Sequence, residues 1–212
     1  MQASRRFLYS ALGVVAVALV GYLGYRWLKF PSDRTPEGAY FRIVKAVNIG
    51  DPKRFFAYLE TPSQHACYTI RTYRRQARDR VLAAYPEPER TRLAESYKAE
   101  AEAPDGADVF EIQVKQRAWL DRLRRDMSGI AKVEINGDRA TVETVKGTRY
   151  PFRRRENGIW GLTLFTATLH AEAEKAARDA GMIEKAAADY ERAKKADDQS
   201  VSRTSNPAVQ KP

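Results

Sequence analysis

The chain has 212 residues, of which 43% are hydrophobic and 30% charged, and its formal net charge is +10. These values are typical of a folded protein with a hydrophobic core, and they exclude a wholly disordered chain. The single cysteine, Cys67, excludes an intramolecular disulfide and a cysteine-based zinc site. The positive charge is spread along the chain, whereas a nucleic-acid-binding protein concentrates it on one face, so we expect no nucleic-acid partner.

The first thirty residues predict a transmembrane anchor, residues 1–29. The stretch from Phe7 to Tyr25 carries no charge, and a helix of about 19 residues spans roughly 28 Å, close to the hydrocarbon thickness of a bilayer. No small-x-small cleavage site follows this stretch, so a retained signal anchor is favoured over a cleaved signal peptide. The sequence therefore predicts a single-pass membrane protein that contacts membrane lipids. We expect its folded part to be extracytoplasmic, although the flanking basic residues leave the orientation nearly undecided.

A short linker, residues 30–35, leads into an α+β domain over residues 36–168. Thr35-Pro36 predicts a helix start, because threonine caps a helix and proline fits its first turn, and Gly50 predicts the end of that helix. Asp51-Pro52 then opens a short aromatic helix.

Residues 63–128 are expected to be almost wholly helical and to form an insertion in this domain. The pair Pro104-Asp105 predicts a break in this region. Asp108 with Glu111 three residues later is typical of a capping box, which predicts one further helix through Met127.

A four-stranded antiparallel meander is predicted to follow. Apolar and polar residues alternate in four short segments, and the dipeptides Asn136-Gly137, Lys146-Gly147 and Asn157-Gly158 separate them. Glycine at such turns supplies the positive φ angle of a tight hairpin. One face of the sheet must be covered by helices, because otherwise Trp160 and its neighbours would be exposed to water.

The chain ends in a predicted helix, residues 169–196, and a disordered tail, residues 197–212. Apolar residues recur along this helix at heptad-like spacing. Two interpretations are open: the seam packs against the rest of the chain, or it binds a partner helix from an envelope protein or a second copy. The seam consists of Leu169, Ala173, Ala176, Ala180, Ile183, Ala187 and Tyr190.

Two segments resemble the nuclear transport factor 2-like superfamily, which includes SnoaL-like proteins. One is TPEGAYFRIVKAVNIGDPKRFFAYL at residues 35–59, and the other is VEINGDRATV followed by FRRRENGIWGL. The resemblance implies a curved sheet wrapped around helices in a cone that often encloses a pocket. The long helical region between the two segments departs from the family's pattern, and no position matches a catalytic motif of its enzymes.

The sequence offers no catalytic constellation. His65 and His170 are far apart, and there is no glycine-rich phosphate loop, nucleophile motif or metal-ligand spacing. We therefore expect no catalytic residue, no metal and no cofactor.

Two residue sets are candidates for binding. An arginine stripe at helical spacing either forms a solvated face or contacts anionic lipid headgroups. A set of aromatic residues either fills the core or lines a pocket between the helices and the sheet. The stripe is Arg71, Arg74, Arg75 and Arg78, and the aromatic set is Tyr40, Phe56, Phe110, Trp119, Tyr150 and Trp160.

Three functions remain open at this point. The favoured one is a membrane-anchored, non-catalytic domain for protein assembly or ligand binding in the cell envelope. The second is a pocket enzyme of the lyase or isomerase type on the same fold, and the third is binding to an anionic membrane surface through the arginine stripe.

Overall fold

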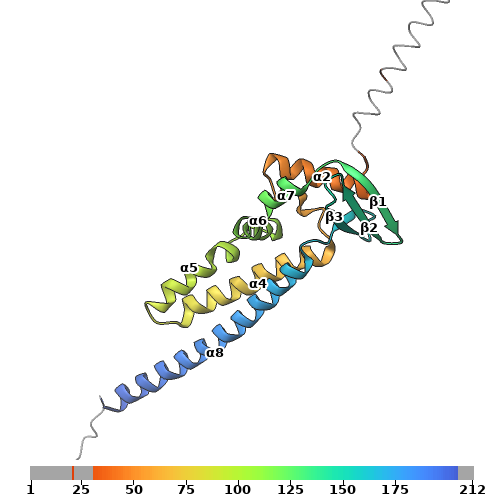
Figure 1. Cartoon of the computed structure of the whole chain (residues 1–212). Coiled ribbons are helices and arrows are strands. Elements are labelled where there is room, and N and C mark those ends of the chain that lie inside the picture. The colour runs from red at the N-terminus through yellow and green to blue at the C-terminus, as the bar shows by residue number, and fades with distance from the viewer. Residues whose placement is uncertain (1–20, 22–30, 205–212) are drawn as a thin grey trace, which may run out of the picture.

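The computed structural model describes residue 21 and residues 31–204, and it has an α+β fold (Figure 1). This part of the chain contains seven helices and one four-stranded antiparallel sheet, which confirms the predicted fold class at that level. The elements are α2 (Pro36–Ile49), α3 (Lys53–Phe56), α4 (Thr61–Ala84), α5 (Glu89–Ala101), α6 (Gly106–Gln116), α7 (Trp119–Asp126), β1 (Ile130–Asn136), β2 (Arg139–Thr144), β3 (Arg149–Arg154), β4 (Trp160–Leu162) and α8 (Thr166–Thr204).

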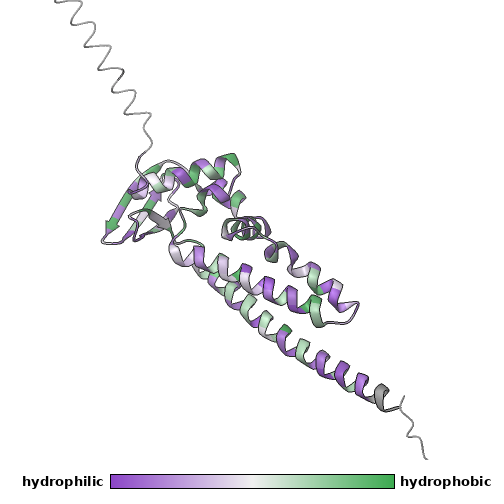
Figure 2. Ribbon diagram, turned by 180° about the vertical axis from the view of Figure 1, so that it is seen from behind, coloured by the Kyte–Doolittle hydropathy of each residue, from purple (hydrophilic) through white to green (hydrophobic). Residues whose placement is uncertain are grey.

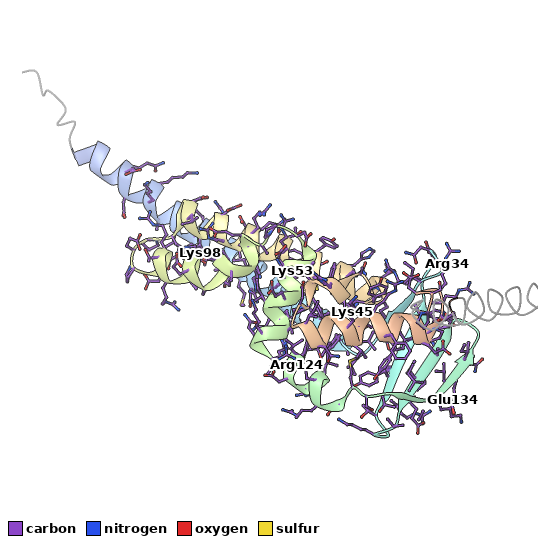
Figure 3. The ribbon with its side chains drawn as sticks, turned by 90° about the horizontal axis from the view of Figure 1, so that it is seen from above. Arg34, Lys45, Lys53, Lys98, Arg124 and Glu134 are labelled. Carbon is purple, nitrogen blue, oxygen red and sulfur yellow. The ribbon has the colours of Figure 1, made fainter. Side chains whose placement is uncertain are left out.

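These elements form a head and an arm (Figure 1). The head contains α2, α3, α7 and the sheet, and the arm contains α4, α5 and α8, with α6 between the two. Figure 3 shows Glu134 on the sheet at the head end and Lys98 of α5 far along the arm. The predicted helical insertion therefore supplies much of the arm.

The sheet is a meander in the order β1-β2-β3-β4, as predicted. Val142 in β2 lies opposite Val133 in β1 and Tyr150 in β3. Glycines in all three connecting turns have positive φ angles, between 61° and 82°, which a side chain with a Cβ atom rarely adopts. The hairpin chemistry of the sequence is thus sufficient to define the strand order.

Helix α2 lies against the inner face of the sheet and starts and ends where the sequence predicts. The Thr35 hydroxyl accepts a hydrogen bond from the Gly38 backbone N–H, and Gly50 ends the helix with a φ angle of 79°. Tyr40 and Ile43 are fully buried against the sheet residues. Burial of such apolar side chains contributes about 1.5–3 kcal/mol each, so the contact between α2 and the sheet stabilises the head.

The arm is held together by parallel packing of α4 against α8. Near the head, the Ser63 and Thr166 hydroxyls are 2.7 Å apart, and at the far end the Tyr85 hydroxyl donates to the Ile183 carbonyl. The seam of α8 faces α4: Ala176 and Ala187 are fully buried, and Figure 2 shows hydrophilic and apolar residues alternating along the helix. Helix α4 of the same chain therefore occupies most of the seam that the sequence left open to a partner.

One predicted helix is divided in two. Ala118 has a φ angle of 51°, and this left-handed residue separates α6 from α7. The division turns Trp119 back toward Phe165, with ring centroids 4.5 Å apart. The capping box also differs from the prediction. The Asp105 side chain accepts a hydrogen bond from the Asp108 N–H, and the Asp108 side chain accepts one from the Asp105 N–H. The Glu111 carboxylate instead pairs with Lys53 and Lys115.

Helix α8 extends further in both directions than the predicted helix. It begins at Thr166 and continues past Asp197 to Thr204. Neither glycine nor proline occurs between Met182 and Thr204, so no residue in that stretch interrupts the backbone hydrogen bonds. The remainder of the predicted tail lies outside the described residues.

The predicted single-pass anchor is contradicted. Within residue 21 and residues 31–204, no helix is long and apolar enough to cross a membrane. The stretch Phe7 to Tyr25, on which that prediction depended, lies outside the described residues apart from Gly21. The predictions of a signal anchor and of a membrane location are therefore not borne out by the described residues.

Candidate ligand cavity

The six predicted pocket aromatics all lie in the core of the head. They belong to one buried cluster, in which Phe110 packs against Phe55 at 5.2 Å and against Trp119 at 6.3 Å between ring centroids. Most of the predicted pocket is therefore filled by its own side chains. Only Trp119 and Tyr150 of the six line a cavity described below.

This cavity lies between α7, β3 and the start of α8. Its volume is about 190 Å³. Ligand pockets are usually about 300–1,000 Å³, but a cavity of about 150 Å³ already holds benzene. The lining residues are Trp119, Arg122, Leu123 and Asp126 from α7, Thr148, Arg149 and Tyr150 around β3, and Leu164, Phe165 and Thr168 around the start of α8.

The Tyr150 hydroxyl is the unusual group in this cavity. The residue is only 2% exposed, and its hydroxyl has no hydrogen-bond partner among the described residues. The neighbouring Tyr40 ring lies 5.5 Å away, and its hydroxyl is satisfied: it donates to the Ser128 carbonyl at 2.8 Å and accepts from the Ser128 N–H at 3.1 Å. A buried polar group without a hydrogen bond costs about 1–3 kcal/mol of stability. The Tyr150 hydroxyl could therefore gain a hydrogen bond, as donor or acceptor, from a bound molecule.

Burial raises the pKa of Tyr150 well above its ordinary value of 10.0, and the neighbouring Tyr40 and Asp126 raise it further. Burial also raises the pKa of Tyr40, while its hydrogen bond to Ser128 acts in the opposite direction. Both hydroxyls therefore keep their protons at neutral pH.

Two opposite charges of α7 line the same cavity. Arg122 and Asp126 are four residues apart, which places them on one face of the helix. Within the described part of the chain, neither side chain forms a hydrogen bond or an ion pair. The third charged lining residue, Arg149, differs because its guanidinium pairs with Glu134 at 3.1 Å and lies 3.9 Å from Glu143. The wall thus contains one exposed cation and one half-buried anion that have no ion pair with any described residue.

The rest of the wall is apolar. Trp119 stacks at a 30° angle on Phe165, and Leu123 is buried beside them. Leu164, in contrast, is 44% exposed and lies where the cavity opens to solvent. The site therefore combines an aromatic and aliphatic interior with a few polar groups, which is the usual composition of a small-molecule site.

The arginine stripe lies elsewhere, between the helices of the arm. Arg74 is 6% exposed and pairs with Glu100 at 3.0 Å, Glu172 at 3.3 Å and Asp179 at 2.5 Å. A buried guanidinium cannot contact a lipid headgroup, so the lipid-contact interpretation is corrected for this residue. The other three also bond to the C-terminal end of α5: Arg71 to the Ala103 carbonyl, Arg75 to the Ala101 carbonyl and Arg78 to the Glu102 carboxylate.

The sequence-based reasoning missed the charged residues of the cavity. Trp119 and Leu123 are four residues apart, as are Arg122 and Asp126, so their common helix face is visible in the sequence. The signal that would single them out, a buried tyrosine hydroxyl without a partner, depends on tertiary packing. No cluster of metal-ligating side chains occurs in the region that the structure describes.

Comparison of the chain with known protein families, with curated proteins and with solved structures finds no match. The resemblance to the nuclear transport factor 2-like superfamily therefore stays a prediction, as do the predicted lipid and protein partners.

Proposed function

We propose that this protein is a non-catalytic binding protein whose head takes a small molecule in the α7–β3–α8 cavity. The single observation that carries this proposal is that Tyr150 lines the cavity while its buried hydroxyl has no hydrogen-bond partner among the described residues. Buried polar groups in native proteins are bonded in the great majority, and the exceptions call for a functional or solvent explanation. A ligand polar group would supply the missing partner.

The cavity lies next to the start of α8, which is part of the arm. Phe165 and Thr168 in its wall lie at the start of α8. One turn further along α8, Glu172 pairs with Arg117 at 2.9 Å and with the buried Arg74. A molecule in the cavity would therefore contact the start of α8, one of the helices of the arm. Its binding could change the packing where the head and the arm join.

A pocket enzyme has less support than a binding protein. Asp126 is the only carboxylate in the cavity wall, and no histidine lines it. The buried carboxylate Glu60 lines a separate hollow of about 320 Å³ and accepts a hydrogen bond from the Thr166 hydroxyl. Neither acid has a second catalytic group arranged with it, which acid–base chemistry requires.

Filling the cavity tests the proposal. Thr168→Phe places a ring in the cavity, whereas Ala167→Phe adds the same ring at the neighbouring, exposed position, which does not line the cavity. We would screen small aromatic and aliphatic fragments, including phenol, by ¹H–¹⁵N NMR of the full chain. Fragments should shift the amides of Trp119, Leu123 and Tyr150 in the unaltered protein and in Ala167→Phe, but not in Thr168→Phe. The proposal fails when no fragment shifts these amides at millimolar concentration.

A second candidate function, assembly with another copy of this chain, is favoured by a groove in the arm. The groove has a volume of about 650 Å³ between α4 and α8, and Gly181 lies in its wall with nothing within 4 Å of the position of a Cβ atom. Asp79 in the groove wall has no ion pair within the described region, so a basic side chain of a second copy would supply its partner.

Light scattering at several protein concentrations tests this second function. Gly181→Leu would fill the groove without a steric clash in the monomer, and Ala171→Leu adds the same side chain at an exposed position outside the groove. A dimer that Gly181→Leu alone dissociates supports assembly through the groove. A monomer at all concentrations, or a dimer indifferent to both changes, counts against it.

A further inference from the structure

We infer that the ligand of the α7–β3–α8 cavity is a free apolar α-amino acid of leucine to phenylalanine size. This inference rests on the proposed function, because it names the class of molecule that the same cavity would take. It follows from three properties of the wall: its charges, its buried hydroxyl and its apolar interior.

The charges of Arg122 and Asp126 favour a zwitterionic ligand. Arg122 has no ion pair among residues 31–204, and its guanidinium suits a carboxylate; Asp126 has none there either, and its carboxylate suits an ammonium group. Both belong to one face of α7, so their partners must be close together in the ligand. In an α-amino acid the carboxylate and the ammonium group are attached to one carbon atom.

The buried hydroxyl strengthens the ammonium assignment. Asp126 lies close enough to Tyr150 to act on it electrostatically, yet the two side chains form no hydrogen bond. A group with several N–H donors placed between them would donate to the Asp126 carboxylate and to the Tyr150 oxygen together. An ammonium group has three such donors.

The interior fixes the rest of the ligand. A volume of about 190 Å³ with walls of Trp119, Leu123 and Phe165 suits one branched aliphatic or aromatic side chain. Simpler ligands leave a charge unpaired: a carboxylic acid without an amine would leave Asp126 alone beside the ligand, and an amine without a carboxylate would leave Arg122 alone. Either analogue would form one charge-assisted hydrogen bond fewer than an amino acid, which weakens binding.

Calorimetry with three related compounds tests the assignment. The probes are L-phenylalanine, 3-phenylpropionate and phenethylamine, which share one ring and differ only in the ammonium or carboxylate group. We expect L-phenylalanine to bind at least about tenfold more tightly than either analogue, because each analogue loses one charge-assisted contact. Asp126→Asn should remove the advantage over 3-phenylpropionate, and Arg122→Gln the advantage over phenethylamine.

Matched controls lie on the same helix outside the cavity wall. Asp121→Asn and Arg125→Gln make the same chemical changes at exposed positions, and they should leave all three affinities unchanged. Loss of binding in these controls would overturn the assigned roles of Asp126 and Arg122.

The outcomes separate the inference from the proposed function. Equal binding of the three compounds, or binding of fragments such as phenol without binding of L-phenylalanine, overturns the amino-acid assignment and leaves the cavity a general ligand site. If neither fragments nor these compounds reach the cavity, both proposals fail. The absence of all binding is also the result expected if a water molecule alone is bonded to the Tyr150 hydroxyl.

Discussion

Arg74 of α4 and Asp179 of α8 form an ion pair of 2.5 Å across 105 positions of sequence. The same guanidinium pairs with Glu100, which belongs to α5, and with Glu172 of α8. One buried side chain therefore joins all three helices of the arm, and the Tyr97 ring lies 5.2 Å from it as a further contact. We expect the arm to depend on this residue more than on any exposed ion pair.

Replacement of Arg74 by methionine tests this dependence. Arg74→Met keeps a long side chain but removes one ion pair from each of three partly buried carboxylates, so we expect a loss of about 3–5 kcal/mol in the free energy of unfolding. Arg178→Met is the control, because Arg178 is exposed and reaches only Glu174 on the same helix. Its effect should stay within about 0.5 kcal/mol in urea denaturation. A cost below about 1 kcal/mol for Arg74→Met would show that the network does not hold the arm.

The two adjacent tyrosines should respond in opposite ways to loss of the hydroxyl. Tyr40→Phe leaves the Ser128 backbone groups unpaired and should lower the free energy of unfolding by about 1–2 kcal/mol. Tyr150→Phe removes a hydroxyl that has no partner among the described residues, so we expect no loss and even a small gain. Thermal and urea denaturation of both variants measures the difference. Equal losses would mean that the Tyr150 hydroxyl is already satisfied, for example by a bound water.

Gly161 lies where the chain before α4 crosses β4, and it has no room for a side chain. A Cβ atom there would lie 2.6 Å from Glu60 Cα and 2.7 Å from Glu60 N, both backbone atoms. We therefore expect Gly161→Ala to destabilise the head by about 1–3 kcal/mol or more. Gly181→Ala is the matched change, because nothing lies near its Cβ position in α8, and alanine should stabilise that helix by about 1 kcal/mol. Similar effects of the two substitutions would contradict the observed close approach at β4.

Acid should weaken the contact between α3 and α6, where Lys53 pairs with Asp108 and Glu111 (Figure 3 labels Lys53). The hydrogen bond from Lys53 lowers the pKa of Asp108 below its ordinary value of 3.8, and Lys115, with Lys53, lowers the pKa of Glu111 below 4.5. A lowered carboxyl pKa in the folded state stabilises the protein above the ordinary pKa, and this stabilisation is lost as pH falls through the folded value.

The free energy of unfolding should therefore fall below about pH 4.5, and Lys53→Met should make that fall shallower. Lys98→Met, which removes a lysine paired with the exposed Glu95 of the same helix, is the control and should leave the slope unchanged. Urea denaturation at several pH values between about 3 and 7 gives the slopes. An equal slope in Lys53→Met and the unaltered protein would contradict this account.

Local chemistry explains what the sequence predicted correctly. The Thr35-Pro36 start, the Gly50 end and the glycine turns of the meander each depend on residues within a few positions of one another. Such signals fix the bounds of an element without knowledge of its neighbours. The left-handed Ala118 gives no such signal, because alanine, unlike glycine or asparagine, has no preference for a positive φ angle.

Long-range pairing explains what the sequence did not predict. In the sequence, Arg74 is one member of a polar stripe. The parallel packing of α4 and α8 places Asp179 beside it, and this contact cannot be inferred from the sequence. In the same way, the sequence indicates the aromatic residues as a set, but whether they fill the core or line a pocket depends on the tertiary structure. The cavity is bounded by three elements, α7, β3 and the start of α8. The charged residues of α7 line a cavity only because the tertiary structure brings these elements together.

Intermolecular nuclear Overhauser effects give the most direct measurement of whether a small molecule occupies the head. With L-phenylalanine at saturating concentration, the ligand ring protons should show contacts to the Trp119 indole and the Phe165 ring, and Thr168→Phe should abolish them while Ala167→Phe leaves them intact. Contacts only to residues outside the cavity wall, or none at all for this ligand and for phenol, would contradict the account.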